Sequence, residues 1–229
     1  MTAVSAAPIR VGPRRYMSPG RGIPALDGVR AVAVALVLAD HGGVPGLSGG
    51  FLGVDVFFVL SGFLITSLLI DEIGRTGRIG LKAFWIRRAR RLLPALIVMV
   101  LAVVALSELF TTEATASLRD DAVATFLWMS NWAFVAQQTD YFSQGAPPSP
   151  LQHTWSLAVE EQYYVLWPLL LAAVVAGLAA VAYRRGVPMT ARAVRTTVFV
   201  VAVGGVIGSA GATFMFSAEA TLNRVYFGT

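Results

Sequence analysis

Five apolar stretches recur along this sequence, each close to the length of a helix that crosses a bilayer. A run of about 20 apolar residues spans the roughly 30 Å hydrocarbon core. The composition agrees, because 56% of the residues are hydrophobic and 14% are charged, against about 25% charged in an ordinary soluble domain. The sequence therefore predicts an all-α, multi-pass membrane protein, a helical bundle of about five spanning helices. The predicted spans are residues 24–41, 51–70, 92–110, 156–181 and 196–216.

A sixth apolar stretch, residues 123–136, is shorter and contains Asn131. Apolar segments of about 10–14 residues are more often re-entrant or interfacial than spanning. If this stretch crossed the bilayer, the basic loops 71–91 and 182–195 would lie on opposite sides, although cytoplasmic loops accumulate Lys and Arg. We therefore predict that residues 123–136 enter the membrane and return to the same side.

The basic residues are concentrated in three segments. Fifteen of the 18 lie in residues 1–22, 71–91 and 182–195. Because cytoplasmic segments accumulate Lys and Arg, we predict a plasma-membrane protein with a cytoplasmic N-terminus and with residues 111–152 outside. The first segment combines four arginines with Pro, Gly, Ser and Ala and has no apolar run, which predicts a disordered tail. Topology thus accounts for the net charge of +5, so the expected partner is the lipid bilayer and not nucleic acid.

The first apolar stretch contains ionisable residues, among them Arg30 and His41. Arg30 and His41 are eleven positions apart, which on a helix places both side chains on one face, roughly 16 Å apart. An ionisable residue at membrane depth costs about 2.5–3.5 kcal/mol on insertion scales and is a functional-site hypothesis by default. We therefore predict that Arg30 and His41 line a polar track.

The second stretch contains several small and polar residues and reads GGFLGVDVFFVLSGFLITSLL from Gly49. Asp55 and Gly62 are seven positions apart and share one helix face, where glycine permits close backbone approach. This face either packs against another helix, with a buried aspartate paired by a neighbour, or lines a substrate path. The spacing alone does not decide between the two.

An arginine cluster, WIRRARRLLPAL, precedes the third stretch. Arg87 and Arg90 have the i, i+3 spacing with which two guanidinium groups bind the phosphates of a nucleotide-bearing donor. Positive-inside anchoring and contact with anionic lipids explain such clusters more often. The spacing therefore favours anchoring and leaves donor binding as the alternative.

The segment LQHTWSLAVEEQYYVLWP carries Glu160 and Glu161 into an apolar helix. Ser156 and Tyr164 each lie one turn from Glu160, so a hydroxyl, a carboxylate and a phenol form one stripe. An interfacial aromatic belt accounts for Trp155 and the other aromatic residues. It does not account for two glutamates inside a membrane helix, for which a functional role is the better hypothesis.

The residue types present exclude some chemistry. The sequence has no cysteine, so a disulfide, a thiol nucleophile and a thiolate metal site are impossible. Its two histidines, His41 and His153, lie outside any metal-binding spacing, so we expect no metal. For His153, a capping role and a catalytic role are equally compatible with its position before a helix. No permanently bound cofactor is expected.

Taken together, these motifs resemble those of acyltransferase family 3, the integral-membrane acyltransferases that modify cell-envelope and extracellular glycans. The resemblance runs from about Gly22 to the last residue. It implies a helical membrane domain that passes an acyl group, acetyl or similar, from acyl-CoA to a hydroxyl of a cell-envelope glycan or glycolipid. The similar features are the Arg30–His41 spacing, GGFLGVDVFFVLSGFLIT, RRARRLLPAL, SNWAF around Asn131 and HTWSLAVEEQYYVLWP.

The resemblance also implies roles for individual residues. Arg30 and His41 match the essential pair of the family's first helix, and Glu160 matches the glutamate of its WSLxxE motif, so these three are the expected catalytic residues. A hydroxyl that attacks a thioester needs a general base near pH 7, which histidine supplies. Direct transfer with His41 as base and a relayed acyl intermediate both fit. The expected substrate-binding residues, which include the FFxxSG and RxxR motifs, are Asp55, Ser61, Gly62, Arg87, Arg90, Trp155, Ser156 and Tyr164.

The family domain usually has about ten spans, whereas this sequence has five predicted spans before it ends at TLNRVYFGT. We therefore expect residues 23–229 to be the N-terminal part of an acyltransferase domain whose C-terminal half is absent. The alternative hypothesis is an inactive truncated remnant, or a non-catalytic membrane subunit that pairs with another chain.

Overall fold

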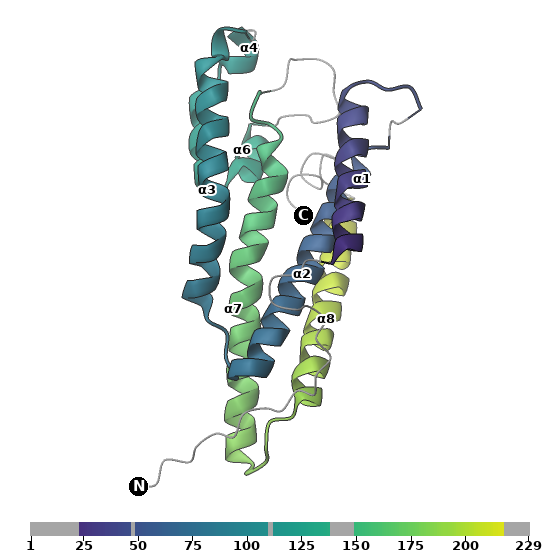
Figure 1. Cartoon of the computed structure of the whole chain (residues 1–229), viewed down its shortest axis with the longest axis vertical. Coiled ribbons are helices and arrows are strands. Elements are labelled where there is room, and N and C mark those ends of the chain that lie inside the picture. Colours follow the sequence, from purple (N-terminus) through teal and green to yellow (C-terminus); the bar gives the residue numbers. More distant parts are fainter. Residues whose placement is uncertain (1–22, 47–48, 110–111, 138–148, 218–229) are drawn as a thin grey trace. The chain divides into compact units, whose positions relative to one another are not determined.

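The computed structural model describes residues 23–46, 49–109, 112–137 and 149–217 of the chain. Within these residues all regular elements are helical, as predicted (Figure 1). The tail predicted at residues 1–22 lies outside the described residues. The elements are α1 Pro24–His41, α2 Leu52–Thr76, α3 Leu81–Ala105, the 3-10 turn η1 Ser107–Leu109, α4 Thr112–Thr115, α5 Leu118–Phe126, α6 Ser130–Ala136, α7 Thr154–Arg184 and α8 Ala191–Ser217.

Three helices of the described residues are long and apolar enough to cross a membrane. They are α2, α7 and the part of α8 from Ala191 to Ala212, and they correspond to the second, fourth and fifth predicted spans. The first predicted span is α1, with the same bounds. Residues 92–105 of the third predicted span lie in α3, which ends at Ala105, before the predicted end at residue 110. That these two helices also cross the bilayer, for a total of five, stays a prediction.

The arginine cluster lies within a helix and not in a loop. The third helix begins at Leu81, well before the predicted start at residue 92, because arginine and leucine are both good helix formers. The charge pattern therefore marked the edge of the apolar stretch and not the end of the helix. The connection from α2 needs only residues 77–80, and Gly77 ends α2 in the left-handed conformation, with φ 73°.

The segment predicted to be re-entrant contains a break between two short helices. Both α5 and α6 are far too short to cross a bilayer, and they contact each other. Between them Trp128 has φ 57°. Its N–H bonds to the Thr125 carbonyl at 3.2 Å, and the Met129 N–H bonds to the Ala124 carbonyl at 2.8 Å. These two bonds form a Schellman motif. The path of residues 123–136 in a membrane stays a prediction.

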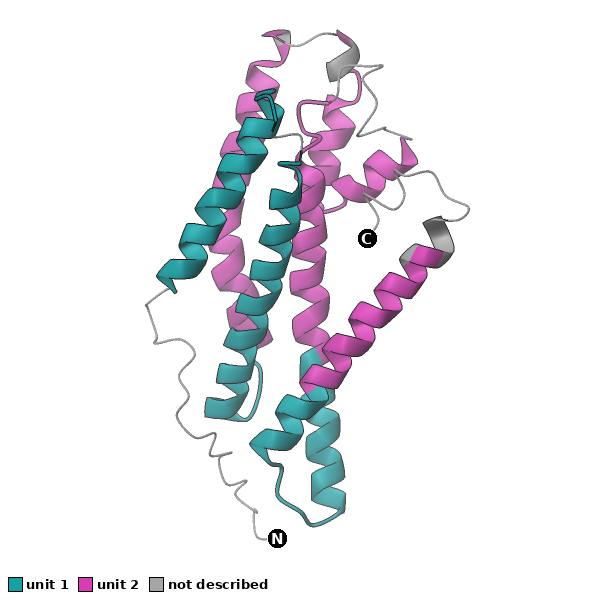
Figure 2. Cartoon of the chain, turned by 90° about the vertical axis from the view of Figure 1, so that its right-hand side faces the viewer, with its two compact units in different colours: residues 1–79, 171–197 teal, residues 80–170, 198–229 magenta. Residues whose placement is uncertain are grey.

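The chain divides into two compact units, coloured separately in Figure 2. Unit 1 comprises residues 1–79 and 171–197, and unit 2 comprises residues 80–170 and 198–229. The helices α7 and α8 each contribute residues to both units. Consequently α1 and α2 belong to unit 1, whereas α3, α5, α6 and the first half of α7 belong to unit 2.

In unit 1, α1 packs directly against α2 (Figure 1). A Cβ atom on Gly50 would overlap the carbonyl oxygen of Leu36, and one on Gly53 would lie 2.5 Å from the carbonyl oxygen of Ala33. These positions therefore accept only glycine, which allows the two helix backbones to approach closely. Toward the C-terminal end of α2, the buried residues form one stripe along the helix, and these are Leu60, Ser61, Ile65, Leu69 and Ile73.

In unit 2, one apolar cluster joins α3 to α5 and to the residues just before α7. Its buried members are Leu96, Val100, Leu118 and Leu151. The helix periodicity explains the first two, which are four positions apart and face the same side of α3. Partly buried apolar residues complete the cluster, and these are Met99, Val103, Ala122, Trp128 and Leu157.

Candidate active site

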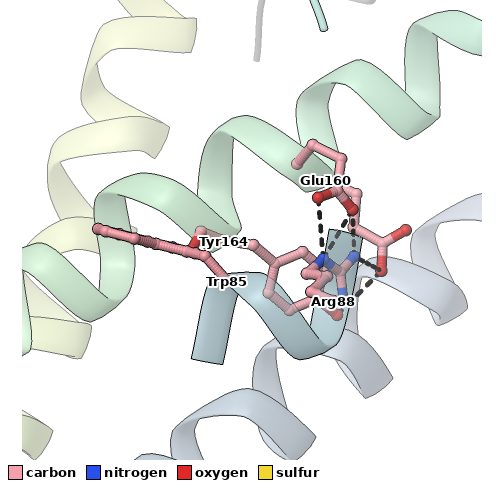
Figure 3. A network of polar contacts seen from close by, with 5 residues as sticks. Trp85, Arg88, Glu160 and Tyr164 are labelled. Carbon is pink, nitrogen blue, oxygen red and sulfur yellow. Dashed lines mark hydrogen bonds and ion pairs between the residues drawn. The ribbon is translucent and has the colours of Figure 1, made fainter. Parts of the chain in front are cut away.

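The two glutamates of α7 lie beside an arginine of α3 (Figure 3). Arg88 donates from Nε to both carboxylate oxygens of Glu161, at 2.8 and 2.9 Å, and Nη2 contacts the same carboxylate. Nη2 also lies 3.8 Å from a carboxylate oxygen of Glu160. The side chains of Arg88, Glu160 and Glu161 are 20%, 24% and 10% exposed. Because these groups are largely shielded from water, their electrostatic interactions are stronger than those of a surface pair.

Tyr164 completes this cluster from one turn along α7. The guanidinium carbon of Arg88 lies 3.1 Å from the centroid of its ring, which is a cation–π contact. The phenol Oη donates to Glu160 at 3.0 Å, so the predicted neighbours Glu160 and Tyr164 do interact. The hydroxyl of Ser156 instead donates to the carbonyl oxygen of His153 at 3.3 Å. We call Arg88, Glu160, Glu161 and Tyr164 the acid cluster.

A proline inside α7 explains a further contact of the acid cluster. Pro168 has no N–H, so it cannot bond to the carbonyl of Tyr164, which is four residues earlier. The indole Nε1 of Trp85, on α3, donates to this carbonyl at 3.1 Å (Figure 3). A side chain of α3 therefore replaces the helical hydrogen bond that the proline removes, and this bond fixes α3 against α7 beside Arg88.

A second polar cluster in unit 2 surrounds Asp121, whose exposure is 0%. One carboxylate oxygen accepts hydrogen bonds from the hydroxyls of Ser117, at 2.8 Å, and Ser149, at 2.6 Å. The other accepts from Nε2 of Gln137 at 3.0 Å. Three donors thus satisfy a fully buried carboxylate, as burial of a charge requires. They come from the beginning of α5, the end of α6 and the residues before α7.

Replacing Asp121 with alanine is expected to destabilise unit 2 strongly. The substitution leaves three donors without their acceptor, and a buried donor left unsatisfied costs about 1–3 kcal/mol. Thermal unfolding of the purified protein in detergent measures the effect, with Asp120→Ala as the control because Asp120 is exposed. The neighbour's substitution should change stability by no more than about 0.5 kcal/mol. Equal midpoints for the two variants would contradict the role given to Asp121.

The other predicted catalytic residues belong to unit 1. Arg30 is half-buried on α1 and lies 3.6 Å from Asp27, an i, i+3 ion pair. His41 is exposed in the last turn of the same helix, with Nδ1 2.8 Å from the carbonyl oxygen of Val37. Because a carbonyl only accepts, Nδ1 carries the proton in this contact, and Nε2 is then the basic nitrogen of the neutral ring.

The predicted substrate-binding residues of α2 have different surroundings. Asp55 is exposed, so the hypothesis of a buried aspartate within the packing seam is wrong. The seam is formed one turn earlier, at Gly50 and Gly53, where glycine allows the two backbones to approach. Ser61 is buried and Gly62 is half-buried.

The predicted donor-binding arginines lie on α3, in unit 2. Arg87 and Arg90 are exposed, whereas Arg88 between them is turned into the acid cluster. Trp155, on the first turn of α7, is 5% exposed and therefore packs inside the protein and not in an interfacial belt. In the part of the chain that the structure describes, no group of three or more His, Asp or Glu side chains could hold a metal ion.

A family described as "Acyltransferase domain" matches residues 23–227. The chain belongs to this acyltransferase family. Peptidoglycan O-acetyltransferase OatA of Listeria monocytogenes is 48% identical over 149 residues, which are 65% of this chain and 24% of that protein. O-acetyltransferase OatA of Staphylococcus aureus is 48% identical over 151 residues, 66% of this chain and 25% of that protein. The putative peptidoglycan O-acetyltransferase YrhL of Bacillus subtilis is 46% identical over 151 residues, with shares of 66% and 24%.

The matched region is thus about a quarter of the length of these relatives. No solved structure is similar enough to the chain to count as a match. Membership of the acyltransferase family agrees with the resemblance seen in the sequence motifs, and with the three apolar helices of a membrane protein.

The sequence of this acyltransferase did not point to four residues that belong to the two polar clusters or contact them. Arg88 was one of four neighbouring arginines, and nothing in the spacing singled it out. Pro168 was a usable signal, because it leaves the carbonyl of Tyr164 in need of a donor. Only the packing of α3 against α7 identifies that donor. The missed residues are Trp85, Arg88, Asp121 and Gln137.

Proposed function

We propose that these residues form part of a membrane O-acetyltransferase that moves an acetyl group from acyl-CoA to a hydroxyl of a cell-wall glycan. The observation that carries the proposal is the acid cluster, in which two carboxylates are held beside Arg88 within a membrane-type helix. Ionisable groups in such a place are expensive and mark functional sites. The three relatives are named as O-acetyltransferases, and the names of two of them give peptidoglycan as the acceptor, which supports the choice of acyl group and acceptor.

In the proposed reaction the acceptor hydroxyl attacks the carbonyl carbon of the thioester. His41 accepts the hydroxyl proton at Nε2, the new O–C bond forms, the C–S bond breaks, and the thiolate of CoA leaves. The contact between Nδ1 and the Val37 carbonyl supports this role because it holds the ring in one tautomer. We propose Arg30 and Glu160 as the other catalytic residues, Arg30 for its charge on the same helix and Glu160 for its place in the acid cluster.

We propose that Arg87 and Arg90 bind the phosphates of the CoA donor. Both are exposed, while the partners of Arg88 are protein carboxylates, and guanidinium groups bind phosphate oxygens in a bidentate manner. The charge distribution of the chain supports a cytoplasmic N-terminus and a cytoplasmic position of this arginine cluster, the side on which acyl-CoA is found.

Transfer of labelled acetyl groups from acetyl-CoA to peptidoglycan, measured in membranes that contain the full-length protein, tests the proposal. We expect label in the glycan, and the double variant Arg87→Ala/Arg90→Ala should raise the KM for acetyl-CoA about tenfold or more. The loss should shrink at high salt, since screening already weakens the wild-type contacts. The matched control is Arg184→Ala, which removes an exposed arginine near the end of α7 and should leave the KM unchanged.

An absence of label in the glycan would contradict the proposed function. An equal increase in KM for the arginines of α3 and for Arg184 would instead assign both clusters to membrane anchoring. In that case the acetyl transfer would stand and the donor site would not.

A further inference from the structure

The residue that follows the two glutamates of α7 contacts a different part of unit 2. Gln162 donates from Nε2 to the backbone carbonyl of Trp128 at 2.7 Å and to Oδ1 of Asn131 at 2.9 Å. Its own Oε1 accepts a longer hydrogen bond, 3.4 Å, from Nε1 of Trp132. The amide of this glutamine is therefore bonded to the break between α5 and α6 and to the first turn of α6.

The break presents the Trp128 carbonyl through an unfavourable backbone conformation. Trp128 has φ 57°, in the left-handed region where the Schellman motif usually places glycine. A side chain at this position strains the backbone, and such strain persists only where the surroundings enforce it. Here the indole packs against the apolar cluster that contains Leu96 and Leu151. Packing of the Trp128 side chain thus holds the carbonyl that Gln162 binds.

Three successive residues connect α7 to two different elements. Glu160 and Glu161 contact Arg88 of α3, and Gln162 contacts the α5–α6 break. Successive side chains of a helix point 100° apart. The side chains of Glu160 and Gln162 therefore leave α7 in widely separated directions. About two turns earlier, Thr154 adds a second bond toward α6, because its carbonyl accepts from the Ser130 hydroxyl at 2.9 Å. Contacts on both sides oppose rotation of α7 about its axis.

We infer that Gln162 is a positioning residue of the proposed acetyl transfer: by binding the α5–α6 break it sets the rotation of α7 that presents Glu160 and Tyr164 to Arg88. The inference rests on the proposed role of Glu160. Without the glutamine amide, the bond at Thr154 still holds that side of α7, but about two turns away from Gln162. The carboxylate of Glu160 then samples orientations that do not serve the reaction.

The test replaces Gln162 with methionine, which keeps the length of the side chain and removes the amide. The matched control is Gln137→Met, because Gln137 also donates its amide to an acceptor within unit 2 but binds Asp121. With labelled acetyl-CoA and peptidoglycan, Gln162→Met should lower kcat about tenfold per folded molecule and leave the KM for acetyl-CoA unchanged. Gln137→Met should lower the amount of folded protein and leave kcat per folded molecule unchanged.

A double-mutant cycle separates positioning from a general structural effect. In a Glu160→Gln background, which we expect to retain weak activity, Gln162→Met should reduce kcat less than twofold, because the residue it positions is already altered. The same tenfold reduction in both backgrounds would overturn the inference. So would a normal kcat in Gln162→Met, and so would full activity in Glu160→Gln.

Hydrogen exchange of the purified protein tests, without reference to activity, whether Gln162 holds α7 against the α5–α6 break. Peptides covering residues 127–136 and 154–164 should exchange faster in Gln162→Met than in wild type, while a peptide covering residues 95–105 of α3 should not. Unchanged protection of residues 154–164 would overturn the inference even in an active protein. If wild type transferred no acetyl group, the proposed function would fail, and the exchange data would still decide whether Gln162 holds α7.

Discussion

Alanine at position 41 is expected to lower acetyl transfer by about 10²–10⁴-fold per folded molecule, the usual contribution of a general base. The imidazole of His41 sits at the exposed end of α1 with Nδ1 bonded to the Val37 carbonyl. Methyl in place of imidazole leaves the acceptor hydroxyl without a group that takes its proton near neutral pH. The measurement is transfer of label from acetyl-CoA to peptidoglycan, divided by the amount of folded protein in the membrane.

The control for this prediction is His153→Ala. His153 is the only other histidine of the chain, and it is also exposed. Its replacement should change the normalised rate by less than about threefold, because we assign it no proton transfer. Full normalised activity in His41→Ala would end the catalytic claim. A parallel fall in abundance and activity would make His41 a structural residue of α1, since loss of a packing group lowers both together.

Alanine at position 88 is expected to cost about 3–5 kcal/mol of stability, the range found when one partner of a buried ion pair is removed. Arg88 is the cation that binds Glu161, whose side chain is 10% exposed, and it also covers the ring of Tyr164. Its loss leaves two neighbouring carboxylates facing each other without a charge between them. We expect a large fall in the thermal midpoint in detergent, together with loss of acetyl transfer.

Two further variants test whether the loss of stability is specific to Arg88 and to the shape of its guanidinium group. Arg87→Ala removes the preceding, exposed arginine of the same helix and should change stability by no more than about 0.5 kcal/mol. Arg88→Lys should recover only part of the stability, because an ammonium group lacks the planar fork that binds Glu161 through two nitrogen atoms. Equal thermal midpoints for Arg87→Ala and Arg88→Ala would contradict the prediction.

Local spacing predicted those features that depend on neighbours within one helix. The bounds of α1 follow from the length of a mainly apolar stretch, and the contact between Glu160 and Tyr164 follows from a spacing of one helical turn. The same reasoning placed Ser156 beside Glu160, where the structure has it bonded to His153 instead. Spacing brings two side chains to one helix face, but it does not decide which of the nearby hydrogen-bond acceptors each side chain binds.

The sequence by itself determined the helical class, the three membrane-type helices and the positions of the polar motifs along them. These properties depend on the length of each apolar stretch and on the 3.6-residue period of the helix, and both can be read from residues close together in the sequence. Only the tertiary structure decided that Arg88, among four clustered arginines, is the cation of Glu161, and that Trp85 replaces the hydrogen bond removed by Pro168. Arg88 and Glu161 are 73 residues apart. Such pairings depend on how α3 packs against α7, which no local pattern encodes.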